Sequence, residues 1–386
     1  MTALEHWLSQ KLEERKEQQR YRQRWQHQPG VVDFAGNDYL GFSQHPAVIK
    51  AATQAAEQFG SSAAASPLVG GYCAIHQRLE ERLAACLGRE RALLFPSGFQ
   101  ANLAVLDALS GRGDYCLHDR LNHASLLDGT RLSGARLERY AHLDSSDLEH
   151  RLTRLEGKQG QRFIVSDGIF SMEGDIAPLN ALGTLAARHD ATLIIDDAHG
   201  VGVMGSSGAG VCEGSHPQQV AVVIGTFSKA LGSQGAFVAG SQQLIEGLIQ
   251  LARPYIYSTG LAPMSAAAAD QAVQLAMEAP EHRDRLHHHI ALFQQLARAA
   301  GLEPLPSVTP IQSLVVGDET LTMALAQRLL DDGLRVGAIR PPTVPNGSSR
   351  LRITLSARQR PDDIRRLVER LACHYNVFSS DNLTTS

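Results

Sequence analysis

Between residues 91 and 252 the chain alternates short, β-branched apolar runs with stretches of helical length. The apolar runs predict strands near 91–95, 114–118, 136–140, 162–166, 192–196, 220–224 and 235–239. The stretches between them predict helices near 98–109, 146–155, 179–188 and 241–252. Strands and helices that alternate in this way form a mostly parallel sheet whose two faces are both covered. We therefore expect an α/β fold around one large seven-stranded, mostly parallel sheet.

The two ends of the chain differ from this central region. Residues 3–25 predict a very polar helix, which we expect to lie against a partner subunit or over a site, because such a helix is unstable alone. A long helical stretch from about 263 to 300 is broken near Pro280. The pattern beyond it predicts a small α+β domain. We expect an N-terminal helical arm over 1–45, a large domain over 46–275 and a small C-terminal domain over 276–386.

Composition excludes several classes of protein. A chain of 386 residues is long enough for two domains, and its net charge of −4 gives no electrostatic case for nucleic acid or an anionic membrane. No apolar run approaches the ~20 residues of a membrane span, and the first residues lack the pattern of a secretion signal. The five cysteines are odd in number and form no Cys-x-x-Cys pair, which predicts reduced thiols in the cytoplasm.

Two predicted strands end in residues suited to an aldehyde cofactor. The strand near 192–196 delivers Asp196 and His199 at its carboxyl end, where open α/β sheets bind their ligands. Lys229 follows the strand near 220–224, in Gly-Thr-Phe-Ser-Lys-Ala-Leu-Gly. A lysine that binds the aldehyde and a carboxylate under a pyridinium nitrogen would form a pyridoxal-phosphate site. Each motif alone has an ordinary alternative interpretation. An aspartate at a strand end is usually a turn or helix-cap residue, and a lysine in a loop is usually solvated.

A phosphate site is predicted where the strand near 91–95 meets the next helix. Ser97 and Gly98 turn the chain, so the Gly98 and Phe99 amides would be free at the helix start to bind a phosphate. Thr226 and Ser228 could add hydroxyl groups to it. The alternative is an ordinary serine N-cap.

Four further features of the sequence are candidates for a functional site. His123 follows the strand near 114–118 and could stack on a pyridine ring, and Ser171 follows another strand and could donate to a phenolic oxygen. A lone histidine is, however, more often structural. The glycine-rich run 202–210 departs from the dinucleotide fingerprint, so we interpret it as a flexible loop. The three histidines 287–289 are interpreted as a solvated helix face rather than a metal site.

Taken together, these motifs resemble the α-oxoamine synthases, which are fold-type I pyridoxal-phosphate enzymes. The resemblance extends from the first helix to about residue 356, and six segments carry it: 37–41, 97–102, 121–127, 167–175, 196–200 and 225–232. These enzymes condense an amino acid with an acyl thioester and release carbon dioxide. Residues 338–345 and 350–356 are most similar to members that use L-alanine and a pimeloyl thioester of CoA or acyl carrier protein. Sister members that use glycine and acetyl-CoA remain an alternative.

The resemblance implies a role for each site residue. Lys229, His123 and Asp196 would be catalytic. The cofactor would be bound by eight residues: Gly98, Phe99, His123, Ser171, Asp196, His199, Thr226 and Lys229. The substrates would be bound by Arg22, His123, Thr343 and Arg352. No metal is expected.

The assignment of Arg352 to the alanine carboxylate has an alternative. Arg350 shares a strand face with Arg352 and competes with it for the alanine carboxylate. The family also implies a homodimer with sites between subunits.

The sequence departs from the family pattern in two places. Residues 61–71 carry side chains where relatives often have glycines, and Gln359 stands where a histidine is usual. A regulatory subunit without cofactor is the alternative from a different class. The presence of Lys229, Asp196, His199 and His123 together argues against it, because a scaffold needs none of them.

Overall fold

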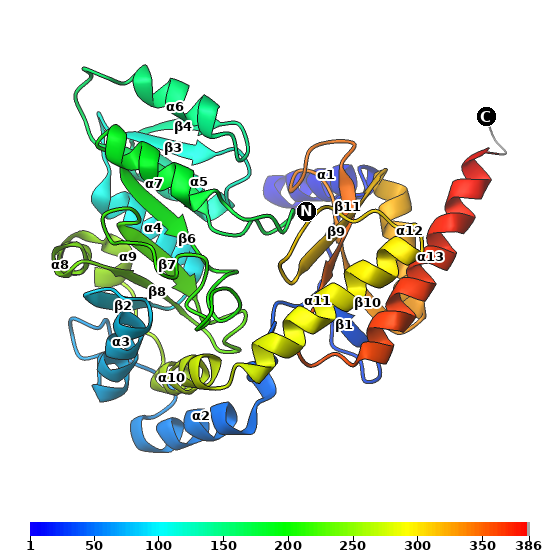
Figure 1. Ribbon diagram of the computed structural model, residues 1–386, viewed down its shortest axis with the longest axis horizontal. Helices are drawn as coiled ribbons and strands as arrows, with labels where there is room; N and C mark the ends of the chain where they lie inside the picture. The colour runs from blue at the N-terminus through cyan, green and yellow to red at the C-terminus, as the bar shows by residue number, and fades with distance from the viewer. Residues whose placement is uncertain (384–386) are drawn as a thin grey trace. The chain divides into compact units, whose positions relative to one another are not determined.

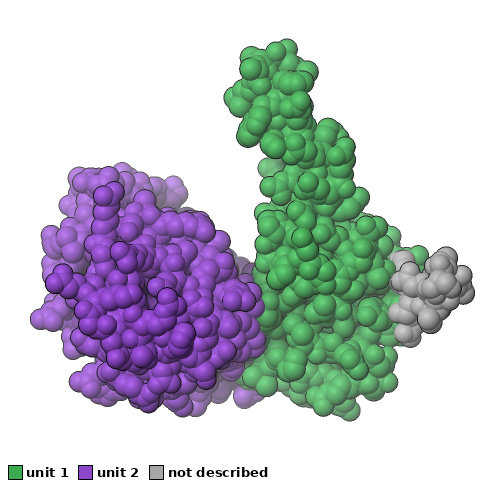
Figure 2. Space-filling view, turned by 90° about the horizontal axis from the view of Figure 1, so that it is seen from above, with its two compact units in different colours: residues 1–36, 172–174, 287–386 green, residues 37–171, 175–286 purple. Residues whose placement is uncertain are grey.

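The computed structural model describes residues 1–383, with side chains described as far as Tyr375, and it divides into two compact units (Figures 1 and 2). Unit 1 comprises residues 1–36, 172–174 and the chain from 287 onward. Unit 2 comprises residues 37–171 and 175–286. The expected domain limits at residues 45 and 275 remain predictions.

Unit 2 is built on a seven-stranded sheet with the order β2-β8-β7-β6-β5-β3-β4. Its strands are β2 (Arg91–Phe95), β3 (Tyr115–Asp119), β4 (Arg136–Tyr140), β5 (Arg162–Asp167), β6 (Thr192–Asp196), β7 (Val222–Thr226) and β8 (Ala236–Gly240). Strands β7, β6, β5, β3 and β4 pair in parallel, whereas β8 is antiparallel to both of its neighbours. The prediction of a mostly parallel seven-stranded sheet is confirmed.

Helices cover both faces of this sheet because successive strand residues point to opposite sides. On β5, Val165 belongs to a core shared with α4 (Gly98–Leu109), α5 (Ala124–Ser133), α8 (Gln242–Leu251) and α9 (Arg253–Ile256). Its neighbour Ile164 belongs to a second core shared with α6 (Ser145–Thr153) and α7 (Leu179–Arg188). Unit 2 also contains α2 (Pro46–Phe59), α3 (Ala74–Cys86), α10 (Pro263–Glu278) and the short 3-10 helix η1 (Phe42–Gln44).

Unit 1 contains a four-stranded sheet with the order β1-β10-β11-β9. Its strands are β1 (Val32–Phe34), β9 (Ile311–Gly317), β10 (Leu334–Ile339) and β11 (Ser349–Thr354). Helices α12 (Glu319–Asp331) and α13 (Pro361–Leu383) follow β9 and β11, and α11 (Glu281–Ala299) precedes them. Strand β1 was not predicted, and it pairs in parallel with β10, about 300 residues later in the chain.

The N-terminal helix is shorter than expected, which corrects the prediction of a helix to residue 25. Helix α1 spans Ala3–Glu17 and has no buried residue. Gln19 then adopts a left-handed backbone with φ of 54°, which ends the helix. Arg20 and Arg22 beyond it instead hydrogen-bond Asn346 and Thr343. These tertiary contacts outweigh the helical propensity of the arginine-rich sequence.

None of the helices within the described residues is long and apolar enough to cross a membrane.

Candidate active site

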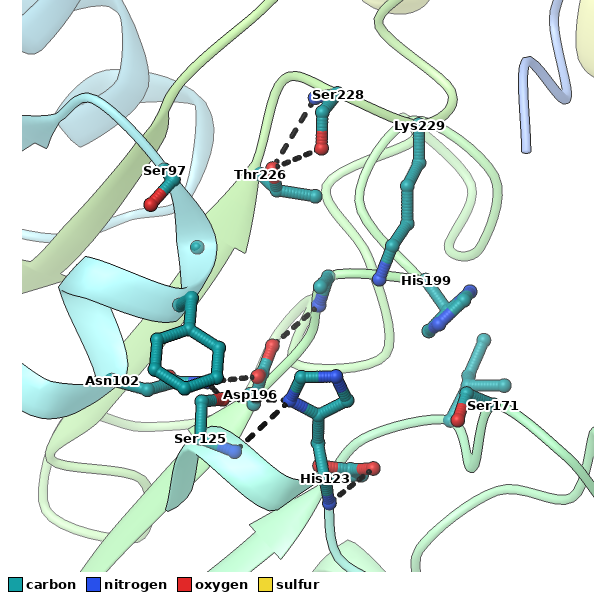
Figure 3. Close-up of a pocket in the computed structure, with 15 residues that line it drawn as sticks. Ser97, Asn102, His123, Ser125, Ser171, Asp196, His199, Thr226, Ser228 and Lys229 are labelled. Carbon is teal, nitrogen blue, oxygen red and sulfur yellow. Dashed lines mark hydrogen bonds between the residues drawn. The ribbon is translucent and has the colours of Figure 1, made fainter. Parts of the chain in front are cut away.

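A cavity of about 250 Å³ lies in unit 2, where the segments that follow β2, β3, β5, β6 and β7 come together (Figure 3). Because β3, β5, β6 and β7 belong to the parallel part of the sheet, their carboxyl ends share one edge. The cavity brings together all eight residues that were predicted to bind a cofactor: Gly98, Phe99, His123, Ser171, Asp196, His199, Thr226 and Lys229.

Asp196 is the last residue of β6 and supplies a carboxylate to the cavity. Its Oδ1 accepts the Ala198 N–H at 3.0 Å, and its Oδ2 accepts an N–H of Asn102 at 2.6 Å. The neighbouring Asp197 is fully buried and accepts the Val211 N–H at 2.8 Å. Burial raises the pKa of Asp197 well above its ordinary range. Of these two adjacent carboxyl groups, only Asp196 lines the cavity.

Lys229 lies in a tight turn after β7, and its side chain extends into the cavity toward Asp196 and His199 (Figure 3). The Gly232 N–H donates to the Lys229 carbonyl at 3.0 Å, which closes the turn. Gly232 has a φ of +59°, and a Cβ there would lie 2.1 Å from the Ser43 nitrogen. The glycine is therefore required for the turn that presents the lysine.

The start of helix α4 forms an anion-binding corner of the cavity. Ser97 caps the helix, since its Oγ accepts the Gln100 N–H at 3.2 Å, so the N-cap interpretation is correct for this hydroxyl. The preceding Gly98 and Phe99 amides lie in the first turn, where N–H groups have no partner within the helix. The Thr226 and Ser228 hydroxyls are 2.8 Å apart, and both residues line the same cavity.

His123 caps helix α5 and lines the cavity from the side of β3. Its ring lies edge-to-face with Phe99 at 6.4 Å between centroids, and its Nδ1 is 2.7 Å from Ser125 Oγ. The His123 backbone N–H donates to the buried Asp167 carboxyl group at 3.2 Å. Burial, together with the positive charge of Lys229, lowers the pKa of His123 below its ordinary value.

His199 is held by a residue that the sequence analysis gave no role. The Tyr39 hydroxyl lies 2.6 Å from His199 Nδ1, and Tyr39 is completely buried. Asn102, Ser125 and Asp167 were likewise missed, although all three line the cavity. The only signal in the sequence was that all four residues fall within segments of the family resemblance.

The glycine-rich loop 202–210 is built around a carboxylate of the chain itself. Glu213 accepts the N–H groups of Ser206, Ser207 and Ala209 at 3.0–3.2 Å. Glu213 therefore occupies N–H groups of a kind that could otherwise bind an anion.

The predicted substrate residues Arg22, Thr343 and Arg352 belong to unit 1. Arg22 donates to Thr343 Oγ1 at 3.3 Å, so the structure brings these two together. Arg352 is on β11, 6% exposed, and donates to Thr354 Oγ1 at 3.0 Å.

Arg350, the competitor of Arg352, forms an ion pair with Glu173 at 2.8 Å and also donates to the Met172 carbonyl. Residues 172–174 are the part of the 167–175 segment that belongs to unit 1, so these contacts lie within that unit.

The family described as aminotransferase class I and II matches residues 29–371. An 8-amino-7-oxononanoate synthase from Cellvibrio japonicus is 48% identical over 379 residues, covering 95% of each chain. A solved 8-amino-7-oxononanoate synthase from Francisella tularensis is 30% identical, with a TM-score of 0.78, over 90% of this chain and 99% of that chain.

A serine palmitoyltransferase from S. paucimobilis, solved with a bound PLP–myriocin adduct, superposes with a TM-score of 0.91. It is 29% identical, over 98% of this chain and 100% of that chain. The match to the family covers most of the chain, and the fold and the lining of the cavity agree with it. The chain therefore belongs to the aminotransferase class I and II family, within which it is similar to the 8-amino-7-oxononanoate synthases.

Proposed function

We propose that this protein condenses L-alanine with a pimeloyl thioester in a pyridoxal 5'-phosphate-dependent reaction. The products are 8-amino-7-oxononanoate, carbon dioxide and the free thiol of CoA or acyl carrier protein, in a step of biotin biosynthesis. The proposal rests on the cavity that joins Lys229, Asp196 and the start of α4, in a chain 48% identical to enzymes of that name.

The residues of the cavity fit pyridoxal phosphate. Asp196 is only 8% exposed, yet it lines the cavity, and its two donors, the Ala198 N–H and the Asn102 amide, are neutral groups. It can therefore still pair with a cationic ring nitrogen, because a nearby carboxylate favours the protonated form of that nitrogen. The Gly98 and Phe99 amides would bind the phosphate with the Thr226 and Ser228 hydroxyls. His199 and Ser171 would contact the phenolic oxygen.

Bound pyridoxal phosphate supplies an electron sink for the negative charge that develops at the alanine Cα. Lys229 would hold the cofactor covalently and, once alanine displaces it, would take the Cα proton on its freed amine. Asp196 would keep the ring nitrogen protonated through the reaction. His123 would orient the acyl group or stabilise the oxygen of the thioester carbonyl as the carrier thiol leaves.

For the substrates, we assign the alanine carboxylate to Arg352, whose planar guanidinium can bind both carboxylate oxygens. Arg350 is the poorer candidate because Glu173 already neutralises it. Arg22 and Thr343 would contact the acyl substrate.

We further propose a homodimer that acts in the cytoplasm. Helix α1 exposes Leu4, Trp7 and Leu8, and unit 2 exposes Leu68 and Val69, so both units present apolar side chains that a second copy would cover. All five cysteines are free thiols, which suits a reducing compartment.

The decisive experiment offers the purified protein matched pairs of substrates. Pyridoxal phosphate is added, and L-alanine with pimeloyl-CoA is compared with glycine and acetyl-CoA, while product mass and thiol release are recorded. We expect a yellow protein that forms 8-amino-7-oxononanoate at the highest kcat/KM, with Lys229→Ala inactive. A preference for glycine and acetyl-CoA would favour the sister activity. A colourless protein without turnover of either pair would indicate a regulatory subunit.

A further inference from the structure

A chain of hydrogen bonds connects His123 to Asp196 through two buried side chains (Figure 3). The Asn102 amide nitrogen lies 2.6 Å from Asp196 Oδ2 and 2.8 Å from Ser125 Oγ. Ser125 Oγ in turn lies 2.7 Å from His123 Nδ1. Asn102 is 1% exposed and Ser125 is 0% exposed, so water cannot readily replace either partner.

The chemistry of these groups fixes the direction of the two hydrogen bonds of Asn102, and the Ser125 backbone indicates the direction of the third. An ionised carboxylate only accepts, so the Asn102 side chain must present its NH₂ group, and that group has two protons to donate. One goes to Asp196 and the other to Ser125 Oγ. The Ser125 backbone N–H donates to His123 Nδ1 at 3.3 Å, which makes this nitrogen an acceptor. The single proton of the Ser125 hydroxyl can then be donated to the same nitrogen.

We infer that Asn102 and Ser125 are positioning residues that hold His123 in its neutral Nε2–H tautomer, with Nδ1 as the acceptor. The inference deepens the proposed function, because it defines which proton His123 offers at the site. The ring edge away from Ser125 faces the part of the cavity that Lys229 enters (Figure 3). His123 therefore presents one N–H donor to a substrate oxygen and is not the base that removes the Cα proton.

This chain of hydrogen bonds also links the tautomer of His123 to the charge on Asp196. If Asp196 were neutral, its hydrogen bond with the Asn102 amide would weaken, and the amide group could then rotate. Asn102 Oδ1 is buried and has no hydrogen-bond partner among the described residues, so the present orientation leaves one polar atom unsatisfied. The charge-assisted bond to Asp196 offsets that cost. The lowered pKa of His123 agrees with a ring that resists a second proton.

The tautomer can be measured without catalysis. Long-range ¹H–¹⁵N spectra of the ¹⁵N-histidine-labelled apoprotein, with His123 assigned by His123→Gln, distinguish a protonated from an unprotonated Nδ1. At pH 7 we expect only the Nε2–H pattern in the wild type, and a mixture of both tautomers in Ser125→Ala and Asn102→Ala. Thr130→Val is the matched control, since it removes a buried hydroxyl on the same helix that binds His118 instead.

A protonated Nδ1 in the neutral wild-type ring would overturn the inference, and so would an unchanged tautomer in a folded Ser125→Ala. The wild-type spectrum decides even if that variant fails to fold. In the holoenzyme, Ser125→Ala should lower kcat about 10- to 100-fold and leave the KM for alanine within about twofold. A protein inactive with every substrate pair would contradict the proposed function, whereas the spectra would still test the tautomer.

Discussion

Arg350 Nη1 lies 2.8 Å from Glu173 Oε1, and the two side chains are only 7% and 15% exposed. The same guanidinium donates through Nε to the Ser348 carbonyl. Removing one partner of a buried ion pair leaves the other charge uncompensated, which is costly. The pair therefore gives Arg350 a structural role and distinguishes it from Arg352, two residues away on the same strand.

Arg352→Lys should raise the KM for alanine at least tenfold and change the KM for the thioester little. Lysine keeps the charge but loses the planar pair of donors that binds a carboxylate. Arg350→Lys should instead lower the melting temperature and affect both substrates alike. Steady-state kinetics with each substrate varied provide the measurement. A stronger selective effect on alanine from Arg350→Lys would show that the assignment of the two arginines is wrong.

Lys229 should be the residue that binds the cofactor. Borohydride reduction of the holoenzyme, followed by peptide mapping, should place the label within Gly225–Gly232. Lys229→Ala should lose turnover, because no other lysine lines the cavity in the described part of the chain. A label on a different lysine would refute the assignment.

Asp196→Asn should reduce kcat by about 10²-fold or more, as expected when a preorganised charge at the electron sink is lost. Asp197 cannot replace it, because its carboxyl group is buried against Val211 and does not line the cavity. Asp197→Asn should therefore lower thermal stability while the folded fraction keeps its cofactor absorbance. Spectra and activity of both variants test this, and wild-type turnover in Asp196→Asn would contradict it.

His142 should make stability fall as the pH rises. Burial disfavours its charge, but hydrogen bonds to Asp119 and Asp175, each at 2.9 Å, raise its pKa to about 10. An unfolded histidine titrates near about 6.5. The stabilisation is therefore complete below that pH, declines by at most about 1.4 kcal/mol per pH unit above it, and is lost above pH 10.

The measurement compares wild type with His142→Gln by thermal unfolding from pH 6 to pH 10. We expect the gap in melting temperature to be largest at pH 6 and to close as the pH approaches 10. His150→Gln is the control, because that side chain is exposed. A gap that is constant across this range would mean that His142 acts without its charge.

The homodimer can be tested by mixing inactive subunits. If residues 61–72 reach the partner's site, Lys229→Ala mixed with an inactive variant in that segment should regain partial activity, since some mixed dimers contain one intact site. Each variant alone should stay inactive. A wild-type enzyme that sediments as a fully active monomer would exclude the shared site.

The arrangement of the cavity was largely predictable because its main residues follow strands. Lys229 and Asp196 stand just beyond β-branched runs, and parallel strands deliver their carboxyl ends to one edge. The residues that hold these groups were not predictable in the same way. Tyr39 meets His199 across 160 positions, and Asn102 meets Asp196 across 94, so no local pattern connects either pair.

Elements set by tertiary contacts were also missed. Strand β1 has only three residues, too few for a periodic signal, and β10 provides its partner. The end of α1 depends on Arg20 and Arg22 meeting residues more than 300 positions away, a distance at which helical propensity carries no information.

The reversed direction of β8 has a consequence for crowding at the cofactor site. In a fully parallel sheet, every strand would send a connecting loop over the same edge. Because β8 starts at this edge instead of ending there, Ala236 pairs with both Phe95 and Thr226. The start of α4 and the Lys229 turn therefore follow two strands, β2 and β7, that lie on either side of β8. In the proposed site, this inverted strand would let the α4 amides and the Thr226 and Ser228 hydroxyls bind one phosphate from two sides.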